Sequence, residues 1–213
     1  MKDMLRMKKY TKLFIDGVWV EPTSGGQRDL INPTTEEVFA SVASGGGIED
    51  VNKAVSAARA AFNSYSKFTL AERIDLITAI MAAYEERQAD FAEAIALEVG
   101  IPFSMKAQVN GPLGHMKVAR DLLKSYNFET RIEDTIIRRE AIGVCGLISP
   151  WNWPIQTPTI KSIYALAAGC TIVLKPSDVS PTSAILLAEV YQKAGVPKGV
   201  FNLVIGKGRV VGE

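Results

Sequence analysis

Hydrophobic and polar residues alternate in a strand-like pattern near the start of the chain. In "LFIDGVWV", residues 13–20, two apolar runs flank Asp16 and Gly17. An Asp-Gly pair in this position is typical of a two-residue β-hairpin turn. "INPTTEEVFASV", residues 31–42, has turn-forming residues followed by apolar ones. We therefore expect a hairpin, a turn and another short strand in this region.

Apolar residues then recur at helical spacing through residues 48–99. The three predicted stripes are Ile48, Val51, Val55, Ala58 and Phe62, then Ile74, Ile77, Met81 and Tyr84, then Phe91, Ile95 and Val99. Thr69 and Glu72 have capping-box spacing at the start of the second helix. Gly100 and Pro102 predict the end of the third helix.

A fourth stretch with helical character covers residues 104–125. Gly111 and Pro112 lie in the middle of it. Because proline lacks a backbone N–H and its ring crowds the preceding turn, we expect the helix to break or kink there.

The pattern changes again at Asn127. "FETRIEDTIIRREAIGV" has a β-rich composition with interleaved charges, which predicts an exposed two-stranded ribbon. Two interpretations stay open for this ribbon. It is either a simple surface hairpin or an edge that pairs with another subunit.

From Ile142 onward the order is strand, helix, strand, helix, strand. The strands are "IGVCGLIS", "CTIVLKP" and "GVFNLVIGKG", and the helices are "IQTPTIKSIYALAAG" and "SPTSAILLAEVYQKAG". Strands that are apolar on both faces predict an α/β fold, with a buried parallel sheet, flanking helices and right-handed crossovers. Gly169 is expected to close the first helix. Ser180 is expected to be the N-cap of the second helix, with Pro181 at its first position and Gly195 after its end.

The last residues, "GKGRVVGE", predict the beginning of a further helix. Three parallel strands with no element after them make an incomplete sheet. We therefore expect the chain to be the N-terminal part of a longer protein.

Composition and charge exclude several classes of function. The chain has 213 residues, enough for one large domain or two small ones. Its net charge of +1 argues against nucleic acid as a partner. Its longest strongly apolar stretch, residues 163–174, is shorter than the roughly 18 residues of a membrane span, and no secretory signal is present. With two cysteines and one histidine, His115, neither a disulfide framework nor a metal site is expected. A cytoplasmic protein is the simplest interpretation.

Three turns follow the carboxyl ends of the predicted parallel strands, at residues 149–154, 175–178 and 206–212. Ligands of open α/β sheets bind outside these strand ends, so we expect the three turns to face one crevice. The glycines of the third turn have G-x-G-x-x-x-G spacing, which differs from the G-x-G-x-x-G dinucleotide fingerprint. They either bind a ligand or simply permit a tight turn.

The second turn carries Lys175 and Asp178 on either side of a proline and a serine. A lysine can donate to ribose hydroxyls and a carboxylate can accept from both of them. The carboxylate would repel a 2′-phosphate, which favours NAD over NADP. Alternatively, Asp178 only complements the positive end of the following helix.

The first turn places Asn152 between Trp151 and Trp153. An asparagine amide that is held rigidly can stabilise an oxyanion on a carbonyl, a contribution of about 3 kcal/mol. The tryptophans would shield such a bond from water. Packing considerations alone favour a structural asparagine among core aromatic residues instead.

Several motifs, in order and spacing, together resemble the aldehyde dehydrogenase superfamily from about Leu13 onward. These motifs are "FIDGVW", "INPTTEEVFASV", "LEVGIP", "GLISPWNWP", "AAGCTIVLKPSDVSP" and "AGVPKGVFNLVIGKG". The resemblance implies NAD(P)-dependent oxidation of an aldehyde to a carboxylic acid, through a thiohemiacetal on a cysteine. It also implies a Rossmann-like cofactor-binding sheet, incomplete here, and a ribbon that serves as an oligomerisation arm.

The resemblance also implies roles for individual residues. Asn152 matches the oxyanion-hole asparagine, and Lys161 falls where a supporting lysine usually lies. The cofactor-binding positions are Ile148, Ser149, Pro150, Trp151, Lys175, Ser177, Asp178, Gly208, Arg209 and Gly212. The substrate-tunnel positions are Trp153, Thr157 and Ile160.

The chain departs from the family pattern in three respects. Trp153 stands where phenylalanine is more usual, and Asp178 stands where glutamate is commoner in NAD users. The family's nucleophilic cysteine and general-base glutamate are expected beyond residue 213, so the chain alone is expected to be inactive. Cys145 and Cys170 are interpreted as small core residues, because nothing near them in the sequence would lower a thiol pKa.

By this resemblance, residues 10–126 form the N-terminal strands and helices of the cofactor-binding domain, residues 127–141 the ribbon, and residues 142–213 the truncated Rossmann-like half. A homodimer or homotetramer is the expected assembly.

Two other hypotheses for the function stay open. One is a non-catalytic module for nucleotide binding or assembly, and the other is an unrelated Rossmann-type oxidoreductase that is active on its own.

Overall fold

The structure, a computed structural model, describes residues 8–212 of the chain. Its strands are β1 (Lys8–Tyr10), β2 (Leu13–Ile15), β3 (Val18–Val20), β4 (Gln27–Ile31), β5 (Val38–Ala43), β6 (Glu129–Ile132), β7 (Thr135–Arg138), β8 (Val144–Ile148), β9 (Thr171–Lys175) and β10 (Phe201–Leu203). Its helices are α1 (Ile48–Tyr65), α2 (Leu70–Glu85), α3 (Gln88–Val99), α4 (Ala107–Leu123), α5 (Gln156–Ala167), α6 (Thr182–Lys193) and α7 (Gly208–Val211).

The main sheet has the strand order β3-β2-β10-β9-β8. Strands β8, β9 and β10 run parallel, with Leu174 of β9 level with Leu147 on one side and Leu203 on the other. The N-terminal hairpin extends this sheet, because β2 pairs antiparallel with β10. Asp16 and Gly17 form the hairpin turn with positive φ angles of 53° and 77°, as an Asp-Gly turn requires. The predicted α/β fold and the hairpin are confirmed.

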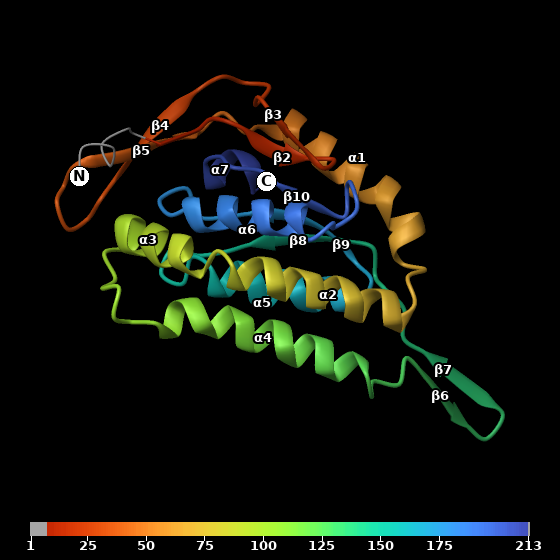
Figure 1. Ribbon diagram of the computed structural model, residues 1–213. Coiled ribbons are helices and arrows are strands. Elements are labelled where there is room, and N and C mark those ends of the chain that lie inside the picture. Colours follow the sequence, from red (N-terminus) through yellow and green to blue (C-terminus); the bar gives the residue numbers. More distant parts are fainter. Residues whose placement is uncertain (1–7, 213) are drawn as a thin grey trace.

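Helices cover both faces of the parallel strands (Figure 1). Helix α1 contacts β8, β9 and β10 on one face, and α5 and α6, which connect these strands, cover the other. Helices α2, α3 and α4 form an outer layer against α5 and α6. All five residues of β9 are buried for this reason, and the sheet and helices share one hydrophobic core.

A second sheet of three strands, in the order β1-β5-β4, lies beside the N-terminal hairpin (Figure 1). The sequence pattern predicts β5 but neither β1 nor β4. The sequence of β4, "QRDLI", buries only Leu30, and β1 has three residues, of which two are lysines. Neither strand therefore shows the apolar alternation that predicts a strand.

Glycines bring the N-terminal loop against the end of β10. A Cβ atom on Gly45 would lie 1.6 Å from the carbonyl oxygen of Ser24, and one on Gly46 would lie 2.1 Å from that of Ile205. Gly45 also forms an isolated β-bridge with Gly206. Only glycine permits this close approach of three backbone segments.

The local helix signals are mostly confirmed. Thr69 and Glu72 form the predicted capping box, with the Thr69 N–H donating to Glu72 Oε2 at 2.7 Å. Gly100, Gly169 and Gly195 each follow a helix with φ between 75° and 86°, which is the left-handed conformation typical of helix ends.

Of the predicted break or kink at Gly111 and Pro112, the break is wrong, because α4 is continuous through both residues. Pro112 is the sixth residue of α4, so the helix loses only the bond that its N–H would donate to the Gln108 carbonyl. A Cβ atom on Gly111 would lie 2.8 Å from Gln156 Oε1. The Gly-Pro pair thus serves the close packing of α4 on α5.

The predicted apolar stripe of α1 is wrong in part. Ile48 and Val55 are 69% and 40% exposed, whereas Ala54, Ala58 and Tyr65 are buried. The helix lies so close to the sheet that Thr171 Oγ1 donates to the Ala58 carbonyl at 2.9 Å. Small alanines fit this approach better than branched side chains.

Strand β8 is an edge strand rather than a buried one. Among the residues described it pairs only with β9, and Ile148 is 56% exposed. Cys145 is consequently half-buried, whereas the sequence pattern predicts a fully buried strand at this position. A strand that is apolar on both faces does not reveal from its own sequence whether both neighbours are present.

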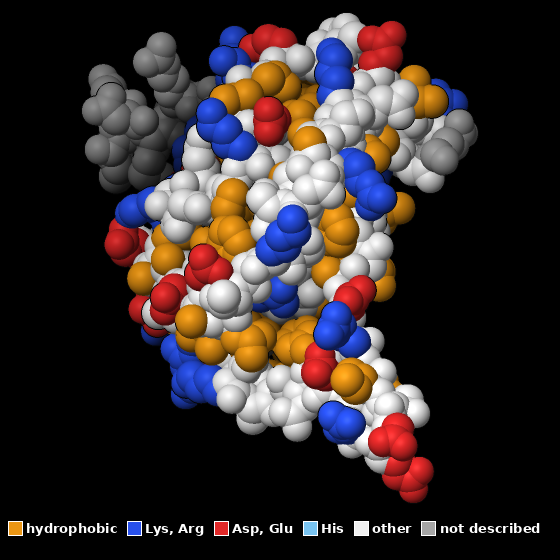
Figure 2. Space-filling view, turned by 90° about the vertical axis from the view of Figure 1, so that its right-hand side faces the viewer, with side chains coloured by type: hydrophobic (Ala, Val, Ile, Leu, Met, Phe, Trp, Pro, Cys, Tyr) orange, Lys and Arg blue, Asp and Glu red, His pale blue; other side chains and the backbone are white. Residues whose placement is uncertain are grey.

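The predicted ribbon is confirmed as the hairpin β6–β7, which projects away from the body (Figures 1 and 2). Every residue of β7 is exposed. Within residues 8–212, no helix combines the length and the apolar character needed to cross a membrane.

Candidate functional site

The turn after β8 begins with two bonds that fix its direction. The backbone N–H of Ser149 donates to the Lys175 carbonyl at 3.1 Å, which continues the pairing of β8 with β9. The Lys161 ammonium, from α5, donates to the Ile148 carbonyl. The predicted supporting lysine therefore holds the last residue of the strand.

Two further side chains hold the middle of this turn. Ser180 Oγ donates to the Trp151 carbonyl at 3.2 Å, and Gln108 Nε2, from α4, donates to the Asn152 carbonyl at 3.2 Å. Gln108 is 3% exposed, so its position is fixed by packing. Residues from α4, α5 and the start of α6 thus fix the backbone on both sides of Asn152.

The Asn152 side chain takes no part in these bonds. It is exposed, and its amide makes no hydrogen bond with any residue between 8 and 212. Trp151 and Trp153 are 56% and 39% exposed, so they are not core residues. A structural asparagine among core aromatic residues does not fit this geometry, whereas a free donor on a fixed backbone does.

Lys175 ends β9 beside this turn. It is 8% exposed, and its ammonium donates to the Pro176 carbonyl at 2.7 Å. Burial lowers the pKa of Lys175 and the nearby Asp178 carboxylate partly opposes that shift. An ammonium with a single carbonyl partner retains capacity for two more acceptors.

Asp178 forms an ion pair that the sequence analysis missed. Its Oδ2 accepts from Nη1 of Arg28, on β4, at 2.9 Å. Arg28 lies in a polar strand with no motif around it, so the sequence carries no signal for this contact. Ser177, the remaining predicted residue of this turn, accepts from the Val179 N–H at 3.3 Å.

The start of α6 corrects another prediction. Ser180 is not the N-cap, and Pro181 occupies that position without a side-chain cap. The free N–H groups of Thr182 and Ser183 instead donate to the carboxylate of Glu98, from α3, at 2.8 Å and 3.2 Å. Ser180 Oγ donates to the Trp151 carbonyl instead of capping the helix.

Glu98 is buried at this helix start. Its two oxygens also accept from the Thr182 and Ser183 hydroxyls. Burial raises the pKa of Glu98, and the hydrogen bonds from Ser183 and Thr182 oppose the shift.

The third turn lies at the same edge of the sheet. Because β8, β9 and β10 are parallel, the turns after all three strands share that edge. Gly208 and Arg209 are exposed at the start of α7, and the Gly212 N–H donates to the Gly208 carbonyl at 2.9 Å. The three predicted turns are therefore neighbours along one edge.

The predicted tunnel residues follow directly from the first turn. Thr157 and Ile160 are half-buried in the first turns of α5, and the Thr157 N–H donates to the Trp153 carbonyl at 3.1 Å. Two buried hydroxyls here, Ser149 Oγ and Thr159 Oγ1, have no hydrogen-bond partner within the described part of the chain. Such groups are available to a ligand or to water.

The thiols show no sign of activation. Burial, followed by the neighbouring Cys170, raises the pKa of Cys145 to about 11. Cys170 is 4% exposed. A nucleophilic cysteine needs the opposite environment.

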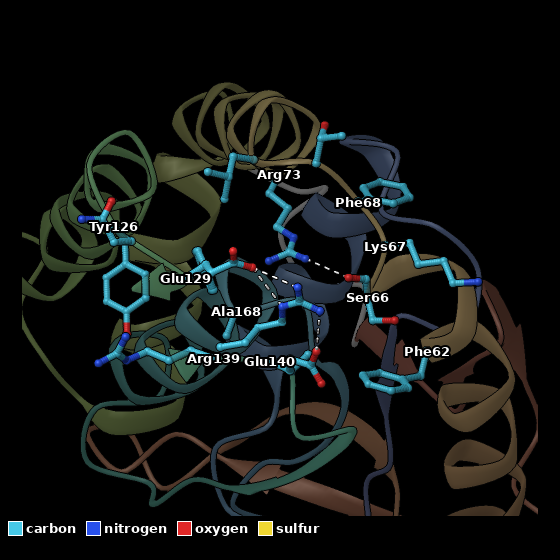
Figure 3. Close-up of a pocket in the computed structure, with 16 residues that line it drawn as sticks. Phe62, Ser66, Lys67, Phe68, Arg73, Tyr126, Glu129, Arg139, Glu140 and Ala168 are labelled. Carbon is cyan, nitrogen blue, oxygen red and sulfur yellow. Dashed lines mark hydrogen bonds and ion pairs between the residues drawn. The ribbon is translucent and has the colours of Figure 1, made fainter. Parts of the chain in front are cut away.

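A large hollow lies elsewhere, at the base of the ribbon (Figure 3). It has a volume of about 750 Å³, and Phe62, Phe68 and Tyr126 are among its lining residues. Arg73 reaches into it. Two nitrogens of its guanidinium already donate to backbone carbonyls, those of Ala167 and Ser66 at two helix ends. This hollow is distinct from the sheet edge that carries the three turns.

Comparison with known proteins defines the family. The model of the Aldehyde dehydrogenase family matches residues 19–213, so the chain belongs to the aldehyde dehydrogenase family. A relative from Staphylococcus epidermidis that is named for this family is 46% identical over 209 residues, which are 97% of the chain and 44% of the relative.

Solved structures agree in fold. A Bartonella henselae aldehyde dehydrogenase has a TM-score of 0.93 at 40% identity and covers 97% of this chain and 44% of its own. A mutant of Pseudomonas syringae aldehyde dehydrogenase C, in complex with NAD+ and octanal, has a TM-score of 0.93 at 49% identity, with coverages of 95% and 42%. The chain thus spans less than half the length of the relatives that it matches.

Proposed function

We propose that this chain forms the NAD-binding and oxyanion-stabilising part of an enzyme that oxidises an aldehyde to a carboxylic acid. The observation that carries the proposal is the turn around Asn152, whose backbone is held by Gln108, Ser180 and Lys161 while its own amide is free. The complex of the similar Pseudomonas syringae enzyme with NAD+ and octanal supports the choice of cofactor and substrate class.

The residues at the sheet edge fit a dinucleotide. Lys175 has spare donor capacity toward ribose hydroxyls, and Asp178 can accept from them. Ser149 Oγ is buried and has no hydrogen-bond partner among residues 8–212, which suits a polar cofactor that covers it. Bound NAD+ would supply the hydride acceptor for the oxidation. The other cofactor positions in this proposal are Ile148, Pro150, Trp151, Ser177, Gly208, Arg209 and Gly212.

Asn152 would act on the aldehyde oxygen. When a thiolate adds to the carbonyl, negative charge develops on that oxygen, and an amide donor on a fixed backbone stabilises it without reorganisation. Trp153, Thr157 and Ile160 would line the path of the aldehyde. The thiolate and the general base would come from residues outside the described range, since Cys145 is not activated.

Replacement of Asn152 tests the oxyanion role. In an enzyme of the relatives' length that includes this chain, Asn152→Ala should lower kcat by about 100-fold, while the Kd for NAD stays near that of the wild type. Asn63→Ala, at an exposed position on α1, is the matched control and should leave kcat unchanged. An unchanged kcat in Asn152→Ala would refute the assignment.

We also propose that the ribbon joins two copies of the protein, as a homodimer or within a homotetramer. Ile132, Ile136 and Ile137 are between 42% and 56% exposed on it, and apolar side chains gather beside its base (Figure 2). Apolar side chains that are exposed together on an edge indicate an interface.

Sedimentation measurements test this assembly. Ile136→Asp should shift the protein toward the monomer, whereas Ile48→Asp, on the exposed face of α1, should not. A monomeric wild type would refute the proposal.

The non-catalytic alternative is a nucleotide-binding or assembly module of such an enzyme. NAD binding without NADH production from an aldehyde would support this alternative. We propose a cytoplasmic location in either case, on the sequence features described above.

A further inference from the structure

Arg28 brings an unexpected positive charge to the proposed cofactor site. It lies on β4, 150 residues before Asp178, and its Nη1 donates to Asp178 Oδ2 at 2.9 Å. The two side chains are 32% and 39% exposed. Exposed ion pairs contribute little to stability, and this pair still reaches the solvent at the sheet edge. A ligand can therefore reach both partners.

Asp178 is the residue expected to distinguish the two dinucleotides. A carboxylate at this position accepts from the ribose hydroxyls and repels a 2′-phosphate. The repulsion requires a negative charge that is not compensated by neighbours. Arg28 contacts this carboxylate, and Lys175 is close enough to interact with it electrostatically. Two cations and one anion thus lie near the proposed ribose position, and these three groups together carry a net positive charge.

We infer that Arg28 is a specificity-determining residue that allows the site to bind the 2′-phosphorylated dinucleotide NADP as well as NAD. The inference rests on the proposed function, because it assumes that the ribose lies between Lys175 and Asp178. A guanidinium carries forked donors that match a phosphate better than a single carboxylate oxygen. When a 2′-phosphate is present, a further N–H of the Arg28 guanidinium can donate to it while Nη1 stays on Asp178, so the carboxylate remains neutralised.

Titration calorimetry with NAD and with NADP tests the inference on the wild-type chain and on two variants. Arg28→Gln should weaken NADP binding by about tenfold or more, since one charge-assisted contact is lost, and should weaken NAD binding by less than about threefold. Arg131→Gln removes the same charge from the exposed ribbon. It should change neither Kd by more than about twofold, because its charge is screened.

A purely structural role for Arg28 gives a different result. In that case Arg28 only ties β4 to the turn after β9, and Arg28→Gln would lower Tm and weaken NAD and NADP equally. Asp178→Asn separates the two roles further. It removes the repulsive charge and leaves Arg28 in place, so the Kd for NADP should fall. Equal changes for both dinucleotides in either variant would overturn the inference.

The outcomes also separate this inference from the proposed function. If the wild type binds neither dinucleotide, both fail. If it binds NAD while NADP binding is absent, or is unaffected by Arg28→Gln, only the role of Arg28 is refuted.

Discussion

The turn at residues 149–154 and the ribbon β6–β7 are both irregular or exposed, yet they are held in opposite ways. Side chains from α4, α5 and the start of α6 bind the turn's backbone or its flanking residue. The ribbon is held mainly by its own pairing, from Glu129 opposite Arg138 to Ile132 opposite Thr135. Because distant residues fix its backbone, the turn would need no reorganisation to bind a ligand, whereas the ribbon lacks comparable support from the rest of the described chain. Substitutions of the residues that support the turn should therefore lower the stability of the whole fold, whereas substitutions in the ribbon should have only local effects.

The largest effect is expected at Glu98, which anchors the start of α6 next to Ser180. Glu98→Ala would leave the N–H groups and hydroxyls of Thr182 and Ser183 without an acceptor in the interior. We expect the free energy of unfolding to fall by about 3 kcal/mol or more, as measured by urea denaturation. A loss below about 1 kcal/mol would mean that water replaces the carboxylate.

Glu98 should also make stability depend on pH. Burial raises its pKa in the folded state above the unfolded value, so the protonated form is favoured on folding. Its stabilising contribution is fully present below the unfolded pKa and is lost as pH rises through the folded pKa. The stability of the wild type relative to Glu98→Gln should therefore fall as pH rises from about 4 toward neutrality. Denaturation curves at several pH values check this, and a constant difference would contradict it.

A smaller effect is expected for Gln108. Gln108→Leu keeps the buried volume but removes the donor to the Asn152 carbonyl. The free energy of unfolding should fall by about 1 kcal/mol, and amide exchange at residues 151–153 should become faster. Asn110→Leu, at an exposed position of the same helix, is the control. Equal effects of the two variants would show that the hydrogen bond from Gln108 does not hold the turn.

The smallest effect belongs to the ribbon. Arg138 and Glu129 form an ion pair with side chains 61% and 53% exposed. Arg138→Gln should change the free energy of unfolding by no more than about 0.5 kcal/mol. A larger loss in thermal denaturation would show that the ribbon is coupled to the core, and the contrast with the turn would disappear.

Local chemistry made much of the fold predictable. The Asp16-Gly17 turn and the Thr69–Glu72 capping box each depend on residues that are close in sequence. The strand-helix alternation after Ile142 was similarly clear, because both periods appear in the pattern of apolar residues.

Contacts between distant residues were not predictable in the same way. The donor from Gln108 to Asn152, the carboxylate of Glu98 at α6 and the pair of Arg28 with Asp178 each join segments far apart in the chain. No periodicity or spacing marks these partners. The sequence therefore indicated which turn to propose as the site, but not which residues hold that turn or which charges lie beside Asp178.

Hydrogen exchange with and without NAD tests the central claim most directly, because it reports on the turn and the ribbon in one measurement. We predict that saturating NAD slows amide exchange in residues 147–154 and 175–179 and leaves residues 129–138 unchanged. Unchanged exchange in both turn segments, or protection confined to the ribbon, would contradict the claim that the turn at residues 149–154 is part of the cofactor site.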